Sequence, residues 1–200
     1  MEFATEFIQK VNGRLAELLS HAKVDACDFG IVNPLQEGYS YAVKDGGKRI
    51  RPMSVYLGAL STGIEIDKAR NDALVDLACM VELVHSYSLV HDDLPAMDND
   101  DYRRGKLSTH KKYGEANGIL IGDGLLTLAM VVGLNLNHGE DFVRGAGYIA
   151  KGAFNMVTGQ ALDLADGKKN YLDVYTLKTA ELISNSFAAA TIVAHEQKNS

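Results

Sequence analysis

The sequence contains only two cysteines, Cys27 and Cys79, among its 200 residues. Two thiols are too few for a disulfide framework and are typical of a protein kept in a reducing compartment. Only three prolines interrupt long stretches in which apolar residues recur with a helical period, and this pattern favours an all-helical protein. Residues 1–10 include two glutamates and no basic start, unlike a secretory signal. We therefore expect a cytoplasmic protein.

The sequence also lacks an excess of positive charge, since 20 lysines and arginines face 26 aspartates and glutamates, for a net charge of −6. This balance argues against nucleic acid as a partner and against an anionic membrane surface. No apolar run is long enough and free enough of charge to be a secure membrane span. With 46% hydrophobic residues, we predict one soluble domain over residues 1–200, large enough to bury a real core.

Helical periodicity predicts helices over residues 3–22, 52–60, 71–93, 118–136 and 142–167, and a last helix that begins at residue 173. In the central helix, 71–93, His85, Ser88 and Asp92 are spaced i, i+3, i+7 and so share one face. Glu82 and His85 also match half of a di-iron carboxylate site, but the chain has no second Glu-x-x-His, so the sequence excludes that site.

The most informative stretch runs from His91 to Gly105 and reads HDDLPAMDNDDYRRG. Its five aspartates crowd together, and each carboxylate resists ionising beside its neighbours. A bound cation explains this better than a solvated loop does, because the run closes a long apolar helix. Oxygen ligands without cysteine suit a hard ion such as Mg²⁺, which binds through a few carboxylates plus substrate phosphates. Arg103 and Arg104 can grip phosphate oxygens, so the stretch predicts a metal-bridged diphosphate site.

Pro95 has a mechanical role in this prediction. It lacks a backbone donor and disfavours helix at Leu94, so the helix should loosen at its metal end. In an unbroken helix Asp92 and Asp98, six residues apart, would point away from each other. A local break therefore has to bring Asp98 round to the metal.

A second stretch, KDGGKRIRP at residues 44–52, sets two glycines beside three cations. Glycine lets the backbone approach an anion closely while the charges close over it. The stretch is not a nucleotide P-loop, because the GxxxxGK[ST] spacing is absent. On these nine residues alone, a solvated basic turn remains an equal alternative to an anion site.

The stretch 91–105 resembles the first aspartate-rich motif of the trans-prenyltransferases, the polyprenyl synthetase family, and most closely its bacterial farnesyl diphosphate synthase (geranyltranstransferase) type. The GGKRIRP segment resembles the isopentenyl diphosphate site of this family. Further matches are THKKYGE at 109–115, GQALD at 159–163 and KTAELI at 178–183. The resemblance extends from about Gly46 to Ala190 with no motif out of order.

The resemblance implies roles for individual residues. The metal ligands are Asp92, Asp93 and Asp98, with Asp163 as an auxiliary ligand; the ion is Mg²⁺, with Mn²⁺ as the alternative. Isopentenyl diphosphate is held by Gly47, Lys48, Arg51, His85 and Arg104. The allylic diphosphate is held by Arg103, Lys178 and Thr179, and Gln160 faces the same diphosphate. The catalytic set is Asp92, Asp93, Asp98 and Lys178, and the chain-length residues are Tyr87 and Ser88.

The implied fold is an all-α isoprenoid synthase-type helical bundle around a central cavity. The implied reaction is head-to-tail condensation of dimethylallyl or geranyl diphosphate with isopentenyl diphosphate, in a homodimer. The aromatic ring of Tyr87, about 7.5 Å before Asp92 along the helix axis, favours a C15 product, farnesyl diphosphate, over C20, geranylgeranyl diphosphate. A terpene cyclase is disfavoured, because it takes no isopentenyl diphosphate and has no need of GGKRIRP and RRG.

One family feature is not found before Ser200: the second aspartate-rich motif, FQxxDDxxD, on a helix that faces the first. We therefore expect a bundle that lacks its C-terminal helices. The sequence is either a fragment of an enzyme or a truncated homologue that serves as a non-catalytic partner subunit of a full-length synthase.

Overall fold

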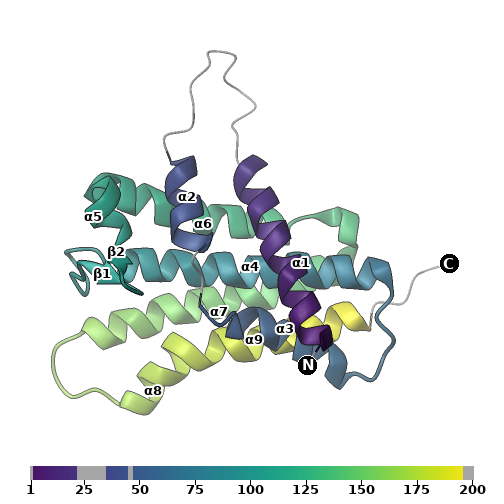
Figure 1. Cartoon of the computed structure of the whole chain (residues 1–200). Coiled ribbons are helices and arrows are strands. Elements are labelled where there is room, and N and C mark those ends of the chain that lie inside the picture. The colour runs from purple at the N-terminus through teal and green to yellow at the C-terminus, as the bar shows by residue number, and fades with distance from the viewer. Residues whose placement is uncertain (1, 22–34, 45–46, 196–200) are drawn as a thin grey trace.

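The computed structural model describes residues 2–21, 35–44 and 47–195, and this part of the chain is almost entirely helical (Figure 1). The elements in chain order are α1 (Glu2–His21), α2 (Gln36–Lys44), α3 (Ile50–Ser61), α4 (Lys68–Asp92), the strands β1 (Tyr102–Arg103) and β2 (Lys106–Leu107), α5 (Thr109–Tyr113), α6 (Glu115–Gly133), the 3₁₀ turn η1 (Leu136–His138), α7 (Glu140–Leu164), α8 (Tyr171–Tyr175), the π-helical turn η2 (Thr176–Ala180) and α9 (Glu181–Ala194). The expected all-α class is confirmed. The sequence-based boundaries of the long helices are correct to within three residues, but a π-helical turn divides the last predicted helix.

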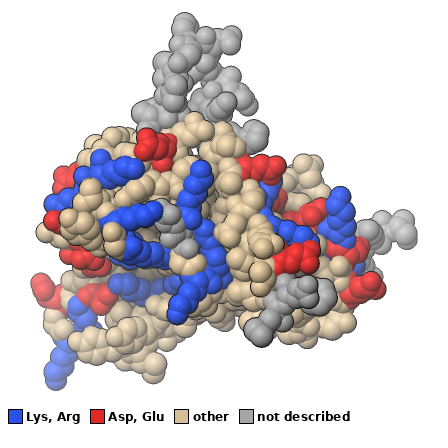
Figure 2. All heavy atoms as spheres, in the orientation of Figure 1, with Lys and Arg blue, Asp and Glu red and all other residues tan. Residues whose placement is uncertain are grey.

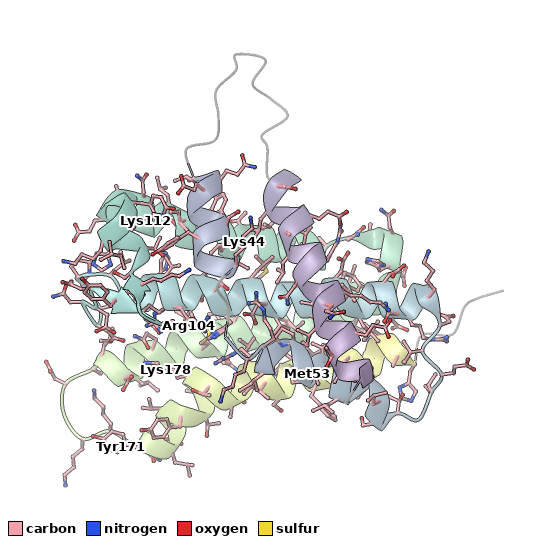
Figure 3. All side chains as sticks on the ribbon, viewed as in Figure 1. Lys44, Met53, Arg104, Lys112, Tyr171 and Lys178 are labelled. Atoms are coloured by element: carbon pink, nitrogen blue, oxygen red, sulfur yellow. The ribbon has the colours of Figure 1, made fainter. Side chains whose placement is uncertain are left out.

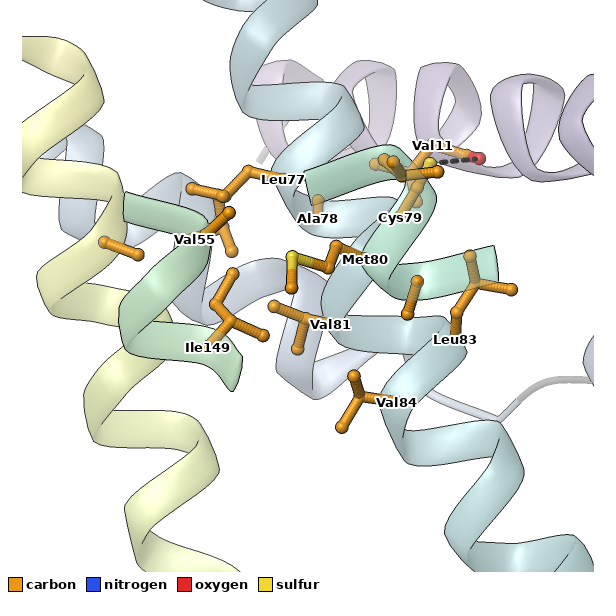
Figure 4. Close-up of a cluster of buried hydrophobic side chains, with 14 of the residues drawn as sticks. Val11, Val55, Leu77, Ala78, Cys79, Met80, Val81, Leu83, Val84 and Ile149 are labelled. Atoms are coloured by element: carbon orange, nitrogen blue, oxygen red, sulfur yellow. Dashed lines mark hydrogen bonds between the residues drawn. The ribbon is translucent and has the colours of Figure 1, made fainter. Parts of the chain in front are cut away.

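Helix α4 lies at the centre, with α1, α2, α3, α6, α7 and α9 packed around it (Figure 1). Every residue from Ala73 to Val84 is buried, as expected of a helix that is apolar on all sides. In Figure 4, Leu77 and Val81 of α4 lie among side chains that include Val55 of α3 and Ile149 of α7. The carboxylate of Asp67 caps the start of α4 by accepting the Arg70 backbone N–H at 2.9 Å.

Two acidic side chains interrupt the apolar surface of α4, and each is paired. Asp76 accepts a hydrogen bond from Arg14 Nε of α1 at 2.7 Å and lies 2.8 Å from His138 Nε2 of η1. Glu82 forms a buried ion pair with Arg49, the residue before α3. These contacts tie three separate segments to α4, and they satisfy charges that would be costly to bury alone.

The chain turns sharply where α4 ends. After Asp92 the backbone folds back, and the Asp98 N–H donates to the Asp92 carbonyl at 2.8 Å. The predicted helix break at Pro95 is therefore present. The next residues form a two-residue hairpin in which Arg103 pairs with Lys106. Its turn residues, Arg104 and Gly105, have φ of 53° and 79°, the positive values that a type I′ turn requires.

Two helical segments are long and apolar enough, by length and composition, to cross a membrane: Lys68–Asp92 and Glu115–His138. The most apolar part of the first is 83% buried inside the protein, and that of the second is 33% buried. The core helix of a soluble protein passes the same test, and Lys68–Asp92 is mostly buried inside this structure.

Candidate active site

A cavity of about 420 Å³ opens beside the carboxyl end of α4, between α4, α7 and η2. Its lining includes many of the predicted site residues: Arg51, His85, Tyr87, Ser88, Asp92, Gln160, Lys178 and Thr179. Its walls include apolar side chains such as Leu89, Met156 and Val157. In Figure 3 the labelled Arg104 and Lys178 mark this end of the molecule. The fold therefore combines charged groups with an apolar chamber, as a ligand with an anionic head and an apolar tail requires.

A smaller cavity of about 150 Å³ adjoins the first, with Arg51 and His85 in both linings. Gly47, Lys48 and Arg104, all predicted to hold isopentenyl diphosphate, line it as well. A Cβ at Gly47 would lie 3.3 Å from the guanidinium carbon of Arg104, so the glycine lets the two segments approach closely. Lysine and arginine side chains gather on this face (Figure 2).

The pair formed by Arg51 and His85 carries unused hydrogen-bonding capacity. Arg51 Nη1 lies 3.1 Å from His85 Nε2, while Arg51 Nε and His85 Nδ1 are buried without a hydrogen-bond partner. Burial, followed by the charges of Arg51 and Arg104, lowers the pKa of His85 to about 3, so the imidazole is neutral near pH 7. Burial also lowers the pKa of Arg51. Buried polar atoms normally find partners, so these point to a polar ligand.

Gln160, on α7, shows the same feature on the other side of the large cavity. Both amide atoms, Oε1 and Nε2, are buried without a hydrogen-bond partner. The amide lines the cavity together with Asp92 and Lys178. Atoms without partners therefore occur on α3, α4 and α7 around one space, which identifies a ligand site rather than a packing defect in one helix.

Asp92 provides the acidic end of the large cavity. Burial raises the pKa of its carboxyl, and the nearby charges of Asp98 and Asp93 add to this, while those of Lys178 and Arg103 oppose it. The turn that joins the Asp98 N–H to the Asp92 carbonyl brings the two acidic residues together. A cation between them would relieve their repulsion.

Asp93 is oriented differently from its neighbour. It is 1% exposed, and Arg103 Nε lies 2.8 Å from both of its carboxylate oxygens, with Nη2 at 2.5 Å from Oδ1. The sequence predicted Asp93 on a metal and Arg103 on the allylic diphosphate. In this structure each is the partner of the other, because the hairpin places Arg103 beside the end of α4, and neither lines the large cavity.

Lys178 reaches the large cavity from the π-helical turn η2. Its ammonium donates to Asp163 Oδ2 at 2.7 Å, and this bond lowers the pKa of Asp163. Burial acts to lower the pKa of Lys178, but the bond to Asp163 and the charge of Asp92 raise it overall. In this structure Asp163 thus orients Lys178, and its role as an auxiliary metal ligand stays a prediction. Gln160 and Thr179 line the cavity beside this pair.

Gly159 makes this arrangement possible, although no role for it was predicted from the sequence. A Cβ at this position would lie 2.4 Å from the Lys178 backbone nitrogen and 2.8 Å from the Leu177 carbonyl carbon. No larger residue fits unless one backbone moves. π-helical turns occur often at functional sites, and here the turn lies directly against α7. The signal for this contact in the sequence is the glycine itself, which has no side chain to keep the two backbones apart.

Tyr87 and Ser88 line the large cavity one helical turn before Asp92. The Tyr87 ring is 5% exposed and packs edge-on against His91, with ring centroids 5.7 Å apart. The Ser88 hydroxyl donates to the His85 carbonyl at 2.8 Å, so it is satisfied within its own helix. Tyr87 is thus a rigid part of the cavity wall. The part of these two residues in chain length stays a prediction.

The acidic side chains of the site can be compared with the ligands that a magnesium ion prefers. Within the ranges that the structure describes, no group of three or more His, Cys, Asp or Glu side chains is arranged to hold a metal ion. Asp92 and Asp98 are adjacent through the turn, whereas Asp93 is bound by Arg103. Mg²⁺ commonly takes one or two carboxylates and completes its shell with substrate phosphates and water. The donor chemistry of Asp92 and Asp98 fits that pattern.

The chain is similar in sequence to known proteins over most of its length. The profile of the polyprenyl synthetase family matches residues 32–200. A farnesyl diphosphate synthase of Micrococcus luteus is 41% identical over 167 residues, which cover 80% of this chain and 56% of that protein. A chloroplastic geranylgeranyl pyrophosphate synthase of Catharanthus roseus is 37% identical over 170 residues, which cover 80% of this chain and 46% of that protein.

The crystal structure of a geranyltransferase from Legionella pneumophila matches with a TM-score of 0.82 at 33% identity, over 99% of this chain and 69% of that one. The expected isoprenoid synthase fold is therefore confirmed. The chain spans about half the length of the curated relatives it matches. Its family profile, its sequence identity and its fold agree, and the chain belongs to the polyprenyl synthetase family.

Proposed function

We propose that this chain supplies the substrate sites of a prenyltransferase that joins an allylic diphosphate head-to-tail to isopentenyl diphosphate. The observation that carries the proposal is the set of buried, unpartnered polar atoms on Arg51, His85 and Gln160 around cavities that also contain Asp92 and Lys178. Diphosphate oxygens would complete the hydrogen bonds of these atoms. The apolar walls would hold the prenyl chain.

The two substrates would bind at different places in this arrangement. Lys48, Arg51 and Arg104 line the small cavity and would hold isopentenyl diphosphate, while neutral His85 donates one further hydrogen bond. Thr179 and Lys178, which Asp163 orients, would hold the allylic diphosphate in the large cavity. Because both cavities include Arg51 and His85, the two diphosphates would lie close enough for their prenyl carbons to meet.

Asp92 and Asp98 would hold Mg²⁺, which would supply the charge stabilisation that lets the allylic diphosphate leave. Lys178 would add its positive charge to the same leaving group, where the pKa shift keeps it protonated. Leu89, Met156 and Val157 would exclude water from the electron-poor allylic carbon. The buried Tyr87 ring forms part of the wall of this chamber and would stop a growing prenyl chain. This favours farnesyl diphosphate as the product, with geranylgeranyl diphosphate as the second candidate.

Binding of isopentenyl diphosphate tests the proposed substrate site without requiring turnover. Isopentenyl diphosphate binding to the purified chain is measured by calorimetry for the wild type and for Arg51→Met. The matched control is Arg144→Met, on the exposed surface of α7. We expect Arg51→Met to weaken binding by about tenfold or more, since it removes hydrogen bonds between charged groups, and Arg144→Met to leave it unchanged. Equal affinity in all three proteins would contradict the assignment of the isopentenyl site.

We further propose that the protein is a cytoplasmic homodimer without stable membrane insertion. Helix α6 supports the dimer, because Leu120 and Val131 on its surface and Leu134 directly after its end are 50%, 61% and 68% exposed. A second copy would cover them. In sedimentation velocity, Val131→Glu should convert a dimer to a monomer, whereas Val157→Glu, on α7, should not. A wild type that sediments as a monomer at micromolar concentration would refute the dimer.

A non-catalytic partner subunit remains the second candidate function. The unpartnered polar atoms favour the enzyme, because a pure partner has no need of them. The isopentenyl incorporation assay described in the Discussion separates the two.

A further inference from the structure

His91, near the carboxyl end of α4, connects the wall of the large cavity to α6. Its side chain lines that cavity together with Tyr87. Its Nε2 also lies 3.1 Å from the Ile119 carbonyl oxygen of α6, whereas Asp123 Oδ1 is 3.7 Å away. A carbonyl can only accept a hydrogen bond, so Nε2 carries the hydrogen and donates it. Because α4 runs between α6 and α7 (Figure 1), His91 is bonded to one neighbouring helix while it lines a chamber that the other helps to enclose.

Gly122 of α6 gives the imidazole of His91 its place. A Cβ at Gly122 would lie 2.1 Å from Nε2 and 2.2 Å from Cδ2 of this ring, which is closer than such atoms approach. The ring therefore lies directly on the α6 backbone, where only glycine leaves room for it. Together with the hydrogen bond to Ile119, this contact fixes the imidazole against α6.

The Tyr87 ring in turn packs against the fixed imidazole. Tyr87 and His91 are spaced i, i+4, so their side chains are neighbours on one face of α4. The rings meet edge-on, with centroids 5.7 Å apart and planes at 84°, an arrangement that aromatic pairs prefer. A tyrosine ring turns about two side-chain torsions, so the groups packed against it determine where it lies. Helix α6 thus determines, through His91, the position of a ring in the wall of the large cavity.

We propose that His91 is a positioning residue for product length, which holds the Tyr87 ring in place as the stop of the apolar chamber. This role rests on the prenyltransferase function proposed above. Without the imidazole, the Tyr87 ring would turn into the space that His91 had filled, and the chamber would admit a longer hydrocarbon chain. His91 acts on the hydrocarbon chain alone in this role, so its removal should change recognition of the chain and not of the head group.

Calorimetry with the whole chain tests this role in the absence of isopentenyl diphosphate, so that no chain elongation takes place. The ligands are farnesyl (C15) and geranylgeranyl (C20) diphosphate below their micelle-forming concentrations, and inorganic diphosphate as a probe of the head-group site. We expect the wild type to bind the C20 ligand about tenfold more weakly than the C15 ligand. His91→Ala should bring this ratio to about threefold or less and leave the affinity for inorganic diphosphate unchanged. His195→Ala, at an exposed position after α9, should alter none of the three affinities.

Two further substitutions show whether His91 acts through Tyr87. Tyr87→Ala should raise the affinity for the C20 ligand, and adding His91→Ala to it should raise that affinity no further. An equal gain from His91→Ala in both backgrounds would overturn the role, because His91 would then act on the chain directly. Gly122→Ala should act in the opposite direction: its methyl group displaces the imidazole from α6 towards the chamber, so the C15 ligand should bind about tenfold more weakly. Gly147→Ala, with nothing within 4 Å of its Cβ position, is the matched control and should leave all three affinities unchanged.

The outcomes separate this role from the proposed function. A wild type that binds neither prenyl diphosphate more tightly than inorganic diphosphate contradicts the function and the role together. A wild type that prefers the C15 ligand, with the same preference in His91→Ala, overturns the role alone. Equal affinity of the wild type for both chains overturns it as well, and so does a loss of inorganic diphosphate binding in His91→Ala that matches the loss for both chains. Circular dichroism and thermal unfolding verify that the variants are folded. Gly122→Ala, which keeps His91, tests the role even where His91→Ala does not fold, and wild-type affinities in that variant would contradict it.

Discussion

Arg103 holds Asp93 by three short contacts, with Nε 2.8 Å from each carboxylate oxygen and Nη2 2.5 Å from Oδ1. The adjacent carboxylate, Asp92, lines the large cavity, and no lysine or arginine in the described part of the chain forms an ion pair with it. Two neighbouring aspartates with the same predicted role thus differ in environment. Asp93 fastens the hairpin to the end of α4, while Asp92 is available to a ligand.

Asp92→Asn and Asp93→Asn should therefore have different effects on folding stability. Asp93→Asn leaves the Arg103 guanidinium without its anion, and we expect the free energy of unfolding to fall by about 1–3 kcal/mol. Asp92→Asn removes a carboxylate that is crowded by Asp98, so stability should be unchanged or slightly higher. Urea unfolding of both variants measures the difference. If both midpoints equal that of the wild type, the pair with Arg103 does not stabilise the hairpin.

The neutral state of His85 predicts a pH dependence of stability. The pKa of His85 is about 3 in the folded protein because of burial and nearby arginines, whereas an unfolded histidine titrates near its ordinary value of 6.5. Between these values the unfolded chain binds more protons, so stability is complete above pH 6.5 and declines as the pH falls towards 3. The loss of unfolding free energy between about pH 7.5 and about pH 5 should be larger for the wild type than for His85→Gln.

The comparison of the two proteins removes the contribution of the other histidines, which both share. A loss of the same size in wild type and His85→Gln would mean that His85 takes up a proton in the folded state at that pH. Diphosphate should reduce the loss, because an anion beside the imidazole favours its charged form.

Much of this site could be predicted from spacing along single helices. His85, Ser88 and Asp92 were expected on one face of the central helix, and all three line the same cavity. The break at Pro95 was also predictable, because proline restricts the residue before it whatever the surroundings are. In each case the interaction lies within one element.

Contacts between elements could not be predicted in this way. The spacing of residues along the chain does not predict the ion pair between Arg103 and Asp93 or the one between Arg49 and Glu82. Each pair depends on how two separate segments of the chain approach one another. The π-helical turn η2 is a further example. Its residues, TLKTA, have no unusual helix preference, and the tight packing of Gly159 against Lys178 is a tertiary effect.

Gly159→Ala should displace η2 from α7. The new Cβ would meet backbone atoms of Leu177 and Lys178, which cannot rotate away. We expect a loss of about 1–3 kcal/mol, the usual cost of overpacking, and weaker diphosphate binding because Lys178 moves. Gly147→Ala, on the same helix, is the control: nothing lies within 4 Å of its Cβ position. That variant should gain up to about 1 kcal/mol from better helix propensity. Gly159→Ala with wild-type stability would show that η2 moves aside freely.

Tyr87→Ala should lengthen the product. The ring is buried in the cavity wall before Asp92, so its removal opens space for a longer chain. In a catalytically active version of the protein, the main product should shift from C15 towards C20 or longer, as measured by chromatography of the dephosphorylated alcohols. Tyr148→Ala, at a 42% exposed position on α7, should leave the product unchanged. An unchanged product in Tyr87→Ala would mean that another side chain stops the growing chain.

The last prediction concerns residues 1–200 tested by themselves. Within the described residues, Asp92, Asp98 and Lys178 supply the charges near the leaving diphosphate, and no second aspartate-rich motif faces them. Apolar side chains of α7 and α8 are also uncovered, with Phe154 72%, Val157 54% and Leu172 73% exposed. Each missing metal contact lowers the stabilisation of the developing charge, which usually dominates such catalysis. The 200 residues alone should therefore bind diphosphate weakly and show little or no turnover.

A chimera that continues them with the C-terminal part of the Micrococcus luteus relative should incorporate labelled isopentenyl diphosphate at the same Mg²⁺ concentration, and Asp92→Asn in the chimera should reduce this incorporation by orders of magnitude. Comparable turnover by the 200-residue protein would refute the prediction and mean that these helices, paired with a second copy, suffice. A chimera that folds and binds both substrates without turnover would instead favour the partner-subunit function.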